Sequence, residues 1–137
     1  MNSKGLFLGL RNISNISSRT SKLVQLKALQ IEHGKDLLKV LQYAYDPFKR
    51  YYITPYLYRS EGSNDIDHHG FDILDRLASR ELSGYMAAET LKDYMASLNP
   101  ESRILFSRIV KKDLRIGMAA KSINAVFPYL IQIVRAT

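Results

Sequence analysis

Apolar residues recur at intervals of three and four along nearly the whole chain, and no stretch alternates convincingly between apolar and polar residues. This spacing is typical of amphipathic helices rather than of strands. Leu6, Leu10 and Ile13 follow it near the beginning, and Leu37 and Leu41 follow it further on. A length of 137 residues leaves room for one domain. We therefore expect an all-α fold, a compact multi-helix bundle formed by residues 1–137 as a single domain.

Capping residues, prolines and glycines predict where the helices begin and end. Ser17, Ser18 or Thr20 could cap the start of one helical pattern. Asp46 and Asn99 each stand before a proline, as an N-cap does when proline is the first helical residue. Gly34 is expected to end a helix. The polar stretch 59–70 is the best candidate for an exposed loop. The expected helices cover about 5–15, 18–33, 35–45, a short 47–53, 71–82, 85–98, 101–114 and 118–128.

Positive charge is concentrated at the two ends of the sequence. Residues 1–31 carry five Lys or Arg and no acid, residues 32–100 carry eight against eleven, and residues 101–137 carry seven against two. The sums are +5, −3 and +5, which add up to the net charge of +7. Such asymmetry indicates a nucleic-acid or anionic-membrane partner, with a solvated basic surface as the alternative. Because the longest apolar runs are far shorter than the ~20 residues of a membrane helix, we expect no membrane partner.

Sequence motifs of common enzyme sites are absent. The chain has no GxxxxGK, GxSxG or HExxH, and it has no cysteine for a disulfide or a thiolate metal site. His68 and His69 adjoin two aspartates in the polar stretch, but a metal site needs more ligands in a fixed geometry. We therefore expect no catalytic residue, cofactor, metal or small-molecule substrate in this chain.

Four tyrosines lie in the segment KRYYITPYLYR. Exposed aromatic rings between cations can stack on unpaired bases, as they do in proteins that bind single strands. The same rings can instead fill the seam between helices. We favour packing for the four, which are Tyr51, Tyr52, Tyr56 and Tyr58.

Two glycine junctions, LSGYMAA and RIGMAA, are the strongest local signal. Met86 and Met118 are 32 residues apart (118 − 86), which predicts two pseudo-repeated helix-turn-helix units. The start of a helix has free amide groups and a positive dipole end, and glycine permits close approach by a phosphate. Two such helix starts side by side on one face could bind the two rows of phosphates that flank a DNA groove. The alternative is that both junctions are only tight corners between closely packed helices. The cations around the second junction are Lys111, Lys112, Arg115 and Lys121.

These junctions carry a resemblance to a known family. LSGYMAAETLKDYM at 82–95 and RIVKKDLRIGMAAKSINAVFPYLI at 108–131 resemble the N-terminal DNA-binding domain of ATP-dependent DNA ligases, most closely the type encoded by T-even bacteriophages. The family pattern has Leu-(Ser/Thr)-Gly before one helix, and Asp-Leu-x-x-Gly before a second that ends in aromatic-Pro. KDLLKVLQYAYDPFKRYYI at 35–53 is also similar. The spacing agrees over about 1–131, so that 132–137 would begin a linker or tail.

The resemblance implies an all-helical domain that holds nicked duplex DNA from the minor-groove side while a catalytic core encircles the other faces. It implies contacts with phosphates and no reading of sequence. The DNA-binding residues that it implies are Ser83, Gly84, Arg115, Gly117, Met118 and Lys121, and the charge argument adds Lys111 and Lys112.

The family's nucleophile motif, Lys-x-Asp-Gly, is missing, because no Asp-Gly occurs in the chain. We therefore expect that the chain alone is no enzyme, and that ATP and Mg belong to the family's catalytic core. The partners implied are duplex or nicked DNA and a separate ligase core, acting in replication, repair and recombination. The implied location is the cytoplasm of a bacterial or phage-infected cell. The alternative is a helical interaction module whose basic ends bind an acidic protein.

Overall fold

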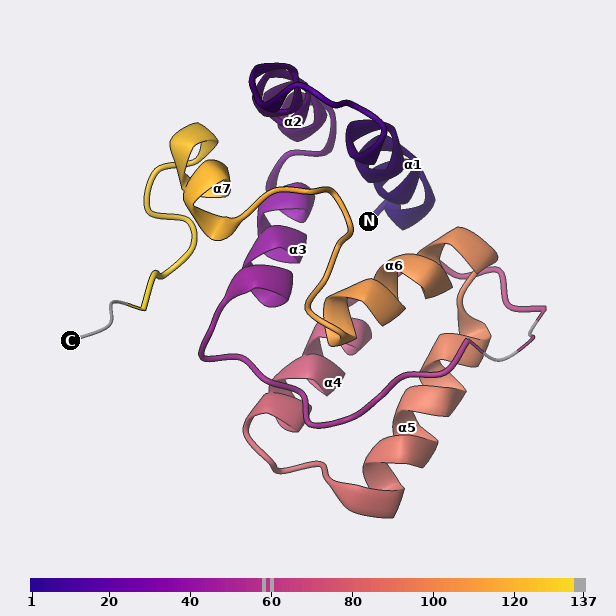
Figure 1. The fold of residues 1–137 in the computed structure, drawn as a ribbon. Helices are drawn as coiled ribbons and strands as arrows, with labels where there is room; N and C mark the ends of the chain where they lie inside the picture. The colour runs from indigo at the N-terminus through magenta and orange to yellow at the C-terminus, as the bar shows by residue number, and fades with distance from the viewer. Residues whose placement is uncertain (58, 60, 135–137) are drawn as a thin grey trace.

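The computed structural model describes residues 1–57, 59 and 61–134, and this part of the chain is all-helical, as predicted. Figure 1 shows the helices gathered in one bundle, in which α6 packs against α1, α3 and α5. Helices from the first and last parts of the sequence lie together, because α1 packs on α6 and α2 packs on α7. No described helix has both the length and the apolar character needed to cross a membrane. The helices are α1 (Ser3–Ser14), α2 (Arg19–His33), α3 (Lys35–Tyr45), α4 (His68–Ala78), α5 (Gly84–Ser97), α6 (Pro100–Val110) and α7 (Ala120–Val126).

The positions that follow the helical periodicity form the core. Leu6, Leu10 and Ile13 on α1 are at most 2% exposed, and Leu37 and Leu41 on α3 are fully buried. Removing a side chain of this size from water contributes roughly 1.5–3 kcal/mol. The first thirty residues are therefore an integral part of the bundle.

Helix boundaries follow the predicted capping residues at several places. The Ser18 side chain accepts a hydrogen bond from the Ser21 amide at 3.3 Å, and the Asn99 side chain accepts one from the Ser102 amide at 2.9 Å. Gly34 separates α2 from α3 with a φ of 61°, a conformation that favours glycine. The predictions for Asn99 and Gly34 are confirmed, and Ser18 is the N-cap among the three candidates for α2.

The short helix predicted over 47–53 is absent. Asp46 ends α3, and its Oδ1 accepts a hydrogen bond from the Phe48 amide at 2.9 Å, so it forms a turn instead of an N-cap. Tyr51 is buried and its hydroxyl donates to the Tyr43 carbonyl oxygen at 2.5 Å. Tyr52 then has a φ of 57°, which excludes helix. From here the chain runs past α4 and along α5 (Figure 1).

The stretch predicted as an exposed loop over 59–70 is partly packed. Ile66 is fully buried, and α4 already begins at His68. Asp65 Oδ1 accepts hydrogen bonds from the hydroxyls of Ser3 at 3.0 Å and Ser102 at 3.3 Å. Because Ser3 and Ser102 belong to α1 and α6, this carboxylate ties the connection to the starts of two helices.

Candidate nucleic-acid interface

The segment 111–119, which joins α6 to α7, holds most of the predicted DNA-binding residues. Leu114 and Ile116 are buried, while Arg115 and Gly117 are exposed. Lys112, Arg115 and Gly117 have φ values of 59°, 58° and 67°. A left-handed residue other than glycine costs on the order of 1 kcal/mol. Burial of the two apolar side chains offsets this cost and holds Arg115 on the surface.

Lys22 of α2 reaches the same segment. Its Nζ donates a hydrogen bond to the Ile116 carbonyl oxygen at 2.7 Å. A Cβ added at Gly117 would lie 2.6 Å from this Nζ. Glycine is therefore favoured here by its positive φ, and a larger residue would have to displace the Lys22 ammonium group. Sequence analysis missed Lys22, because a residue 94 positions away leaves no local signal.

The last helix begins later than predicted. It starts at Ala120 instead of Met118 and has seven residues. Gly117 thus stands apart from the helix start, and the free amide groups expected beside it are not there. Met118 is half-buried, and its carbonyl oxygen accepts a hydrogen bond from the Tyr45 hydroxyl at 2.7 Å. Burial, with a further effect of the Asp113 charge, raises the pKa of Tyr45 to about 12, which keeps this donor protonated.

Three arginines from different elements meet beside the segment. Arg11 of α1 and Arg108 of α6 both lie against the Phe7 ring, with guanidinium carbons 5.8 Å and 5.1 Å from its centroid. Burial lowers the pKa of Arg108, the charges of Arg115 and Arg11 lower it further, and Asp113 opposes them. Neighbouring cations repel one another, and an anion bound between them relieves that repulsion. We call Arg11, Lys22, Arg108 and Arg115 the basic cluster.

The remaining predicted cations of this region divide into two kinds. Lys111 and Lys121 are exposed, as a phosphate contact requires. Lys112 instead is half-buried, and its Nζ donates to the carbonyl oxygens of Asp46 at 2.5 Å and Tyr43 at 3.4 Å. It therefore satisfies backbone acceptors at the end of α3, a structural role that the charge argument did not foresee.

The first junction, between α4 and α5, is open to solvent. Ser83 is the N-cap of α5 without a hydrogen bond from its side chain, and no atom lies within 4 Å of a Cβ placed at Gly84. Tyr85 and Met86 follow in the first turn of α5 and are 76% and 64% exposed. This corner presents the accessible backbone that was expected of both junctions.

The two junctions are similar where the preceding helix ends, but they differ in the helix that follows. Arg80 and Lys112 both follow a helix end in the left-handed conformation, 32 residues apart (112 − 80), and Leu82 and Leu114 are both buried. The helices that follow differ, with 14 residues in α5 and seven in α7. In Figure 1, α5 begins at the bottom of the view, whereas α7 lies at the upper left. A grip that used both junctions would therefore have to extend across the molecule.

The tyrosines of the 49–59 segment do not behave alike. Tyr51 packs into the core as predicted, but Tyr52 and Tyr56 are 61% and 64% exposed, so the packing prediction is wrong for these two. Tyr58 lies outside the described residues.

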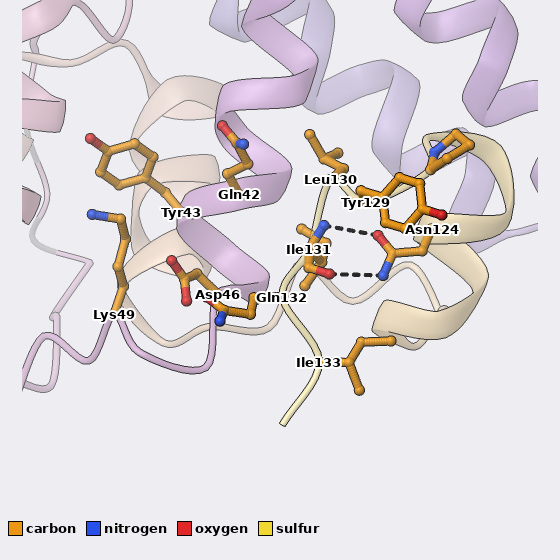
Figure 2. A pocket seen from close by; sticks show the side chains of 11 residues that line it. Gln42, Tyr43, Asp46, Lys49, Asn124, Tyr129, Leu130, Ile131, Gln132 and Ile133 are labelled. Atoms are coloured by element: carbon orange, nitrogen blue, oxygen red, sulfur yellow. Dashed lines mark hydrogen bonds between the residues drawn. The ribbon is translucent and has the colours of Figure 1, made fainter. Parts of the chain in front are cut away.

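A groove of about 990 Å³ lies between the end of α3 and the chain after α7 (Figure 2). Asn124 fixes the chain there, since its side chain accepts from the Ile131 amide and donates to the Ile131 carbonyl oxygen, both at 2.8 Å. On the other side, Lys49 Nζ lies 3.2 Å from Asp75 Oδ1. Three polar residues that line this groove, Asn124, Tyr43 and Lys49, are thus engaged in contacts that hold the fold.

The two neighbouring histidines lie at the start of α4. The rings of His68 and His69 lie 4.4 Å apart, and both residues are exposed. Within residues 1–57, 59 and 61–134, no group of three or more potential ligands could hold a metal ion.

No protein-family model and no curated protein matches the chain. Solved structures that share its fold include one named "Pmar-Lig_Pre.", with a TM-score of 0.77 and 21% identity, and one named "Pmar-Lig_PreS3", with 0.80 and 23%. The matches cover 92% and 96% of this chain but 29% and 31% of those chains. The chain therefore shares the fold of about a third of each of these two chains, whose names mark them as ligases. Nothing in these matches supports the T-even type in particular.

Proposed function

We propose that the chain binds duplex DNA, nicked or intact, through phosphate contacts on the minor-groove side and without reading sequence. In this proposal it is the DNA-binding module of an ATP-dependent DNA ligase of replication and repair, and residues 1–137 form one domain. The basic cluster carries the proposal, because it brings cations from the two basic ends of the sequence to one place. The fold shared with part of two ligases supports it.

The cluster is suited to phosphates for three reasons. Guanidinium groups offer pairs of donors that match phosphate oxygens. The Phe7 ring restrains two of them, Arg11 and Arg108, which reduces the entropy lost on binding. Gly117 has no side chain, and the Lys22 ammonium group lies where one would be, which places a further cation beside Arg115. Lys111 and Lys121 add exposed positive charge at the two ends of the segment that joins α6 to α7.

Titration of a labelled nicked duplex at several salt concentrations tests DNA binding. Each neutralised phosphate contributes about −0.9 to the slope of log K against log salt, so the four cluster cations together with Lys111 and Lys121 predict a slope of about −5.4. Arg115→Gln should reduce the slope by about 0.9, whereas Lys35→Gln, on the exposed start of α3, should leave it unchanged. A slope near zero, or binding of an acidic protein without any affinity for DNA, would contradict the proposal.

A second experiment tests the ligase assignment separately. A ligase catalytic core without its own helical domain is assayed for nick sealing with and without this chain. We expect the chain to increase sealing at a core concentration that is limiting for DNA binding, and the Arg115→Gln variant to increase it less. Tight DNA binding without any increase in sealing would retain the DNA-binding proposal and refute the ligase assignment.

A further inference from the structure

A second groove, of about 370 Å³, runs along α5 on a part of the molecule that the basic cluster does not include. The segment 52–56 forms one side, and α5 forms the other with Ala88, Lys92 and the buried side chains of Leu91 and Met95. Tyr52 and Tyr56 line it with rings that are more than half exposed. The groove therefore has an apolar floor and aromatic sides.

Backbone strain is concentrated at one side of this groove. Tyr52 and Arg80 have φ values of 57° and 66°, and the Arg80 guanidinium carbon lies 4.5 Å from the centroid of the Tyr52 ring. Each left-handed residue costs on the order of 1 kcal/mol. At Arg80 this cost belongs to the end of α4, because helices commonly end with a left-handed residue, whereas Tyr52 follows no helix end. An exposed cation–π contact returns about 0.5–1 kcal/mol, and it holds the Tyr52 ring at this side of the groove.

Exposed apolar side chains continue the surface beyond the groove. Tyr85 stands one turn before Ala88 on the same face of α5 and is 76% exposed, and Leu57, next to Tyr56, is 54% exposed. Single exposed apolar residues are ordinary, but several aromatic ones around one groove indicate an interaction site.

The charges around the groove favour an anionic ligand, and its tyrosine rings favour one with planar groups that can stack on them. Among the described residues that line it, Lys92 carries the one charge, and no carboxylate lines it. Glu81, which follows Arg80 in sequence, lies with its Oε1 3.6 Å from Arg76 Nε. Tyrosine rings between cations are the arrangement by which proteins bind unpaired nucleotides, the bases stacking on the rings and the phosphates meeting the cations.

We propose that this groove binds the unpaired nucleotides of single-stranded DNA, with Tyr52 and Tyr56 stacking on bases and Arg80 and Lys92 beside phosphates. The inference rests on the proposed function, because duplex binding would bring the groove close to an unpaired strand at an overhang or flap. It adds a second contact to DNA, made by other residues and with another chemistry.

The test compares a blunt duplex with the same duplex carrying a single-stranded extension of about ten thymidines. We expect the extension to tighten binding by about tenfold or more. The double variant Tyr52→Leu with Tyr56→Leu should lose this gain and bind the blunt duplex as the unchanged protein does. The pair Tyr52→Phe and Tyr56→Phe retains both rings and should keep the gain. Tyr129→Leu, which replaces an exposed ring outside this groove, should keep it as well.

The outcomes separate the two proposals. Equal affinity for both duplexes would overturn the inference and leave the groove as a surface for a protein partner, while duplex binding would still support the proposed function. A gain that survives the double leucine variant would also overturn it, because the binding would then come from elsewhere. Affinity for a thymidine strand that the double variant abolishes, without any affinity for blunt duplex, would support the groove and contradict the proposed function. Thermal unfolding of each variant verifies that it is folded.

Discussion

Lys22 and Ile116 are joined by a hydrogen bond of 2.7 Å between the lysine Nζ and the isoleucine carbonyl oxygen. This bond connects the start of α2 with the segment between α6 and α7. It therefore joins the two parts of the chain that are rich in positive charge and poor in acids. The charge asymmetry of the sequence thus has a structural counterpart, because its two basic ends meet beside Gly117.

Gly117→Ala should destabilise the fold more than Gly84→Ala does. Both glycines have a positive φ, 67° and 61°, so both substitutions incur a strain on the order of 1 kcal/mol. At Gly117 the new methyl group must also displace the Lys22 ammonium group, whereas space is open at Gly84. The lost hydrogen bond adds about 1 kcal/mol. Urea unfolding of the two variants measures the difference, and equal losses would show that the lysine moves aside without cost.

The helices were predictable where local chemistry determines them. Ser18 and Asn99 cap helices with their own side chains, and the periodicity of α1 and α3 identified core residues correctly. The predictions failed where distant contacts decide. The burial of Tyr51 and its bond to Tyr43 replace the helix expected after Asp46, and no local pattern contains that pairing.

The candidate site was predictable in part for the same reason. Arg115, Lys111 and Lys121 could be predicted as candidates because they lie close together in sequence. Lys22, Arg11 and Arg108 join them through packing between helices, and the acid-free first thirty residues were the one available signal.

Asp65→Asn should reduce stability at neutral pH and have less effect in acid. Burial alone would raise the pKa of Asp65, but hydrogen bonds from Ser3, Asn99, the Lys4 amide and Ser102 lower it. A folded-state pKa below the unfolded value of about 3.9 means that the ionised carboxylate stabilises the fold above that pH. The contribution disappears as the pH falls through the folded-state pKa.

The measurement is the free energy of unfolding of both proteins across pH. We expect a difference of about 0.5 kcal/mol at pH 7, a small value because solvent screens this exposed carboxylate, and the difference should shrink below about pH 4. Asp72→Asn, an exposed change on α4, is the matched control and should have a small effect at every pH. A difference for Asp65→Asn that does not vary with pH would contradict the role of its charge.

Arg103→Met should cost about 2–3 kcal/mol of stability. Arg103 is 8% exposed, and its guanidinium donates to the carbonyl oxygens of Met95 at 3.2 Å and Leu98 at 3.0 Å. These acceptors lie at the end of α5, where carbonyl groups lack helical partners. The Met95 oxygen keeps the Leu98 amide as a donor at 3.2 Å, but the Leu98 oxygen loses the guanidinium donor in the interior, which is costly. Arg76→Met, which removes a partly exposed ion pair with Glu81, should cost less than about 1 kcal/mol. Similar losses in urea unfolding would refute the capping role.

Lys111 and Lys112 are neighbours in sequence but should respond to substitution in opposite ways. The Lys112 ammonium group donates to the carbonyl oxygens of Asp46 and Tyr43 in a half-buried site, so Lys112→Met should lower the free energy of unfolding by about 1–2 kcal/mol. Lys111 is exposed, so Lys111→Met should leave stability within about 0.5 kcal/mol.

In DNA binding, Lys111 should matter more than Lys112. Lys111→Met should reduce the salt slope by about 0.9, and Lys112→Met should leave the slope unchanged in the folded protein. Urea unfolding and DNA titration of both variants measure these effects. A smaller salt slope for Lys112→Met, with no change for Lys111→Met, would assign the phosphate contact to Lys112 and contradict this prediction.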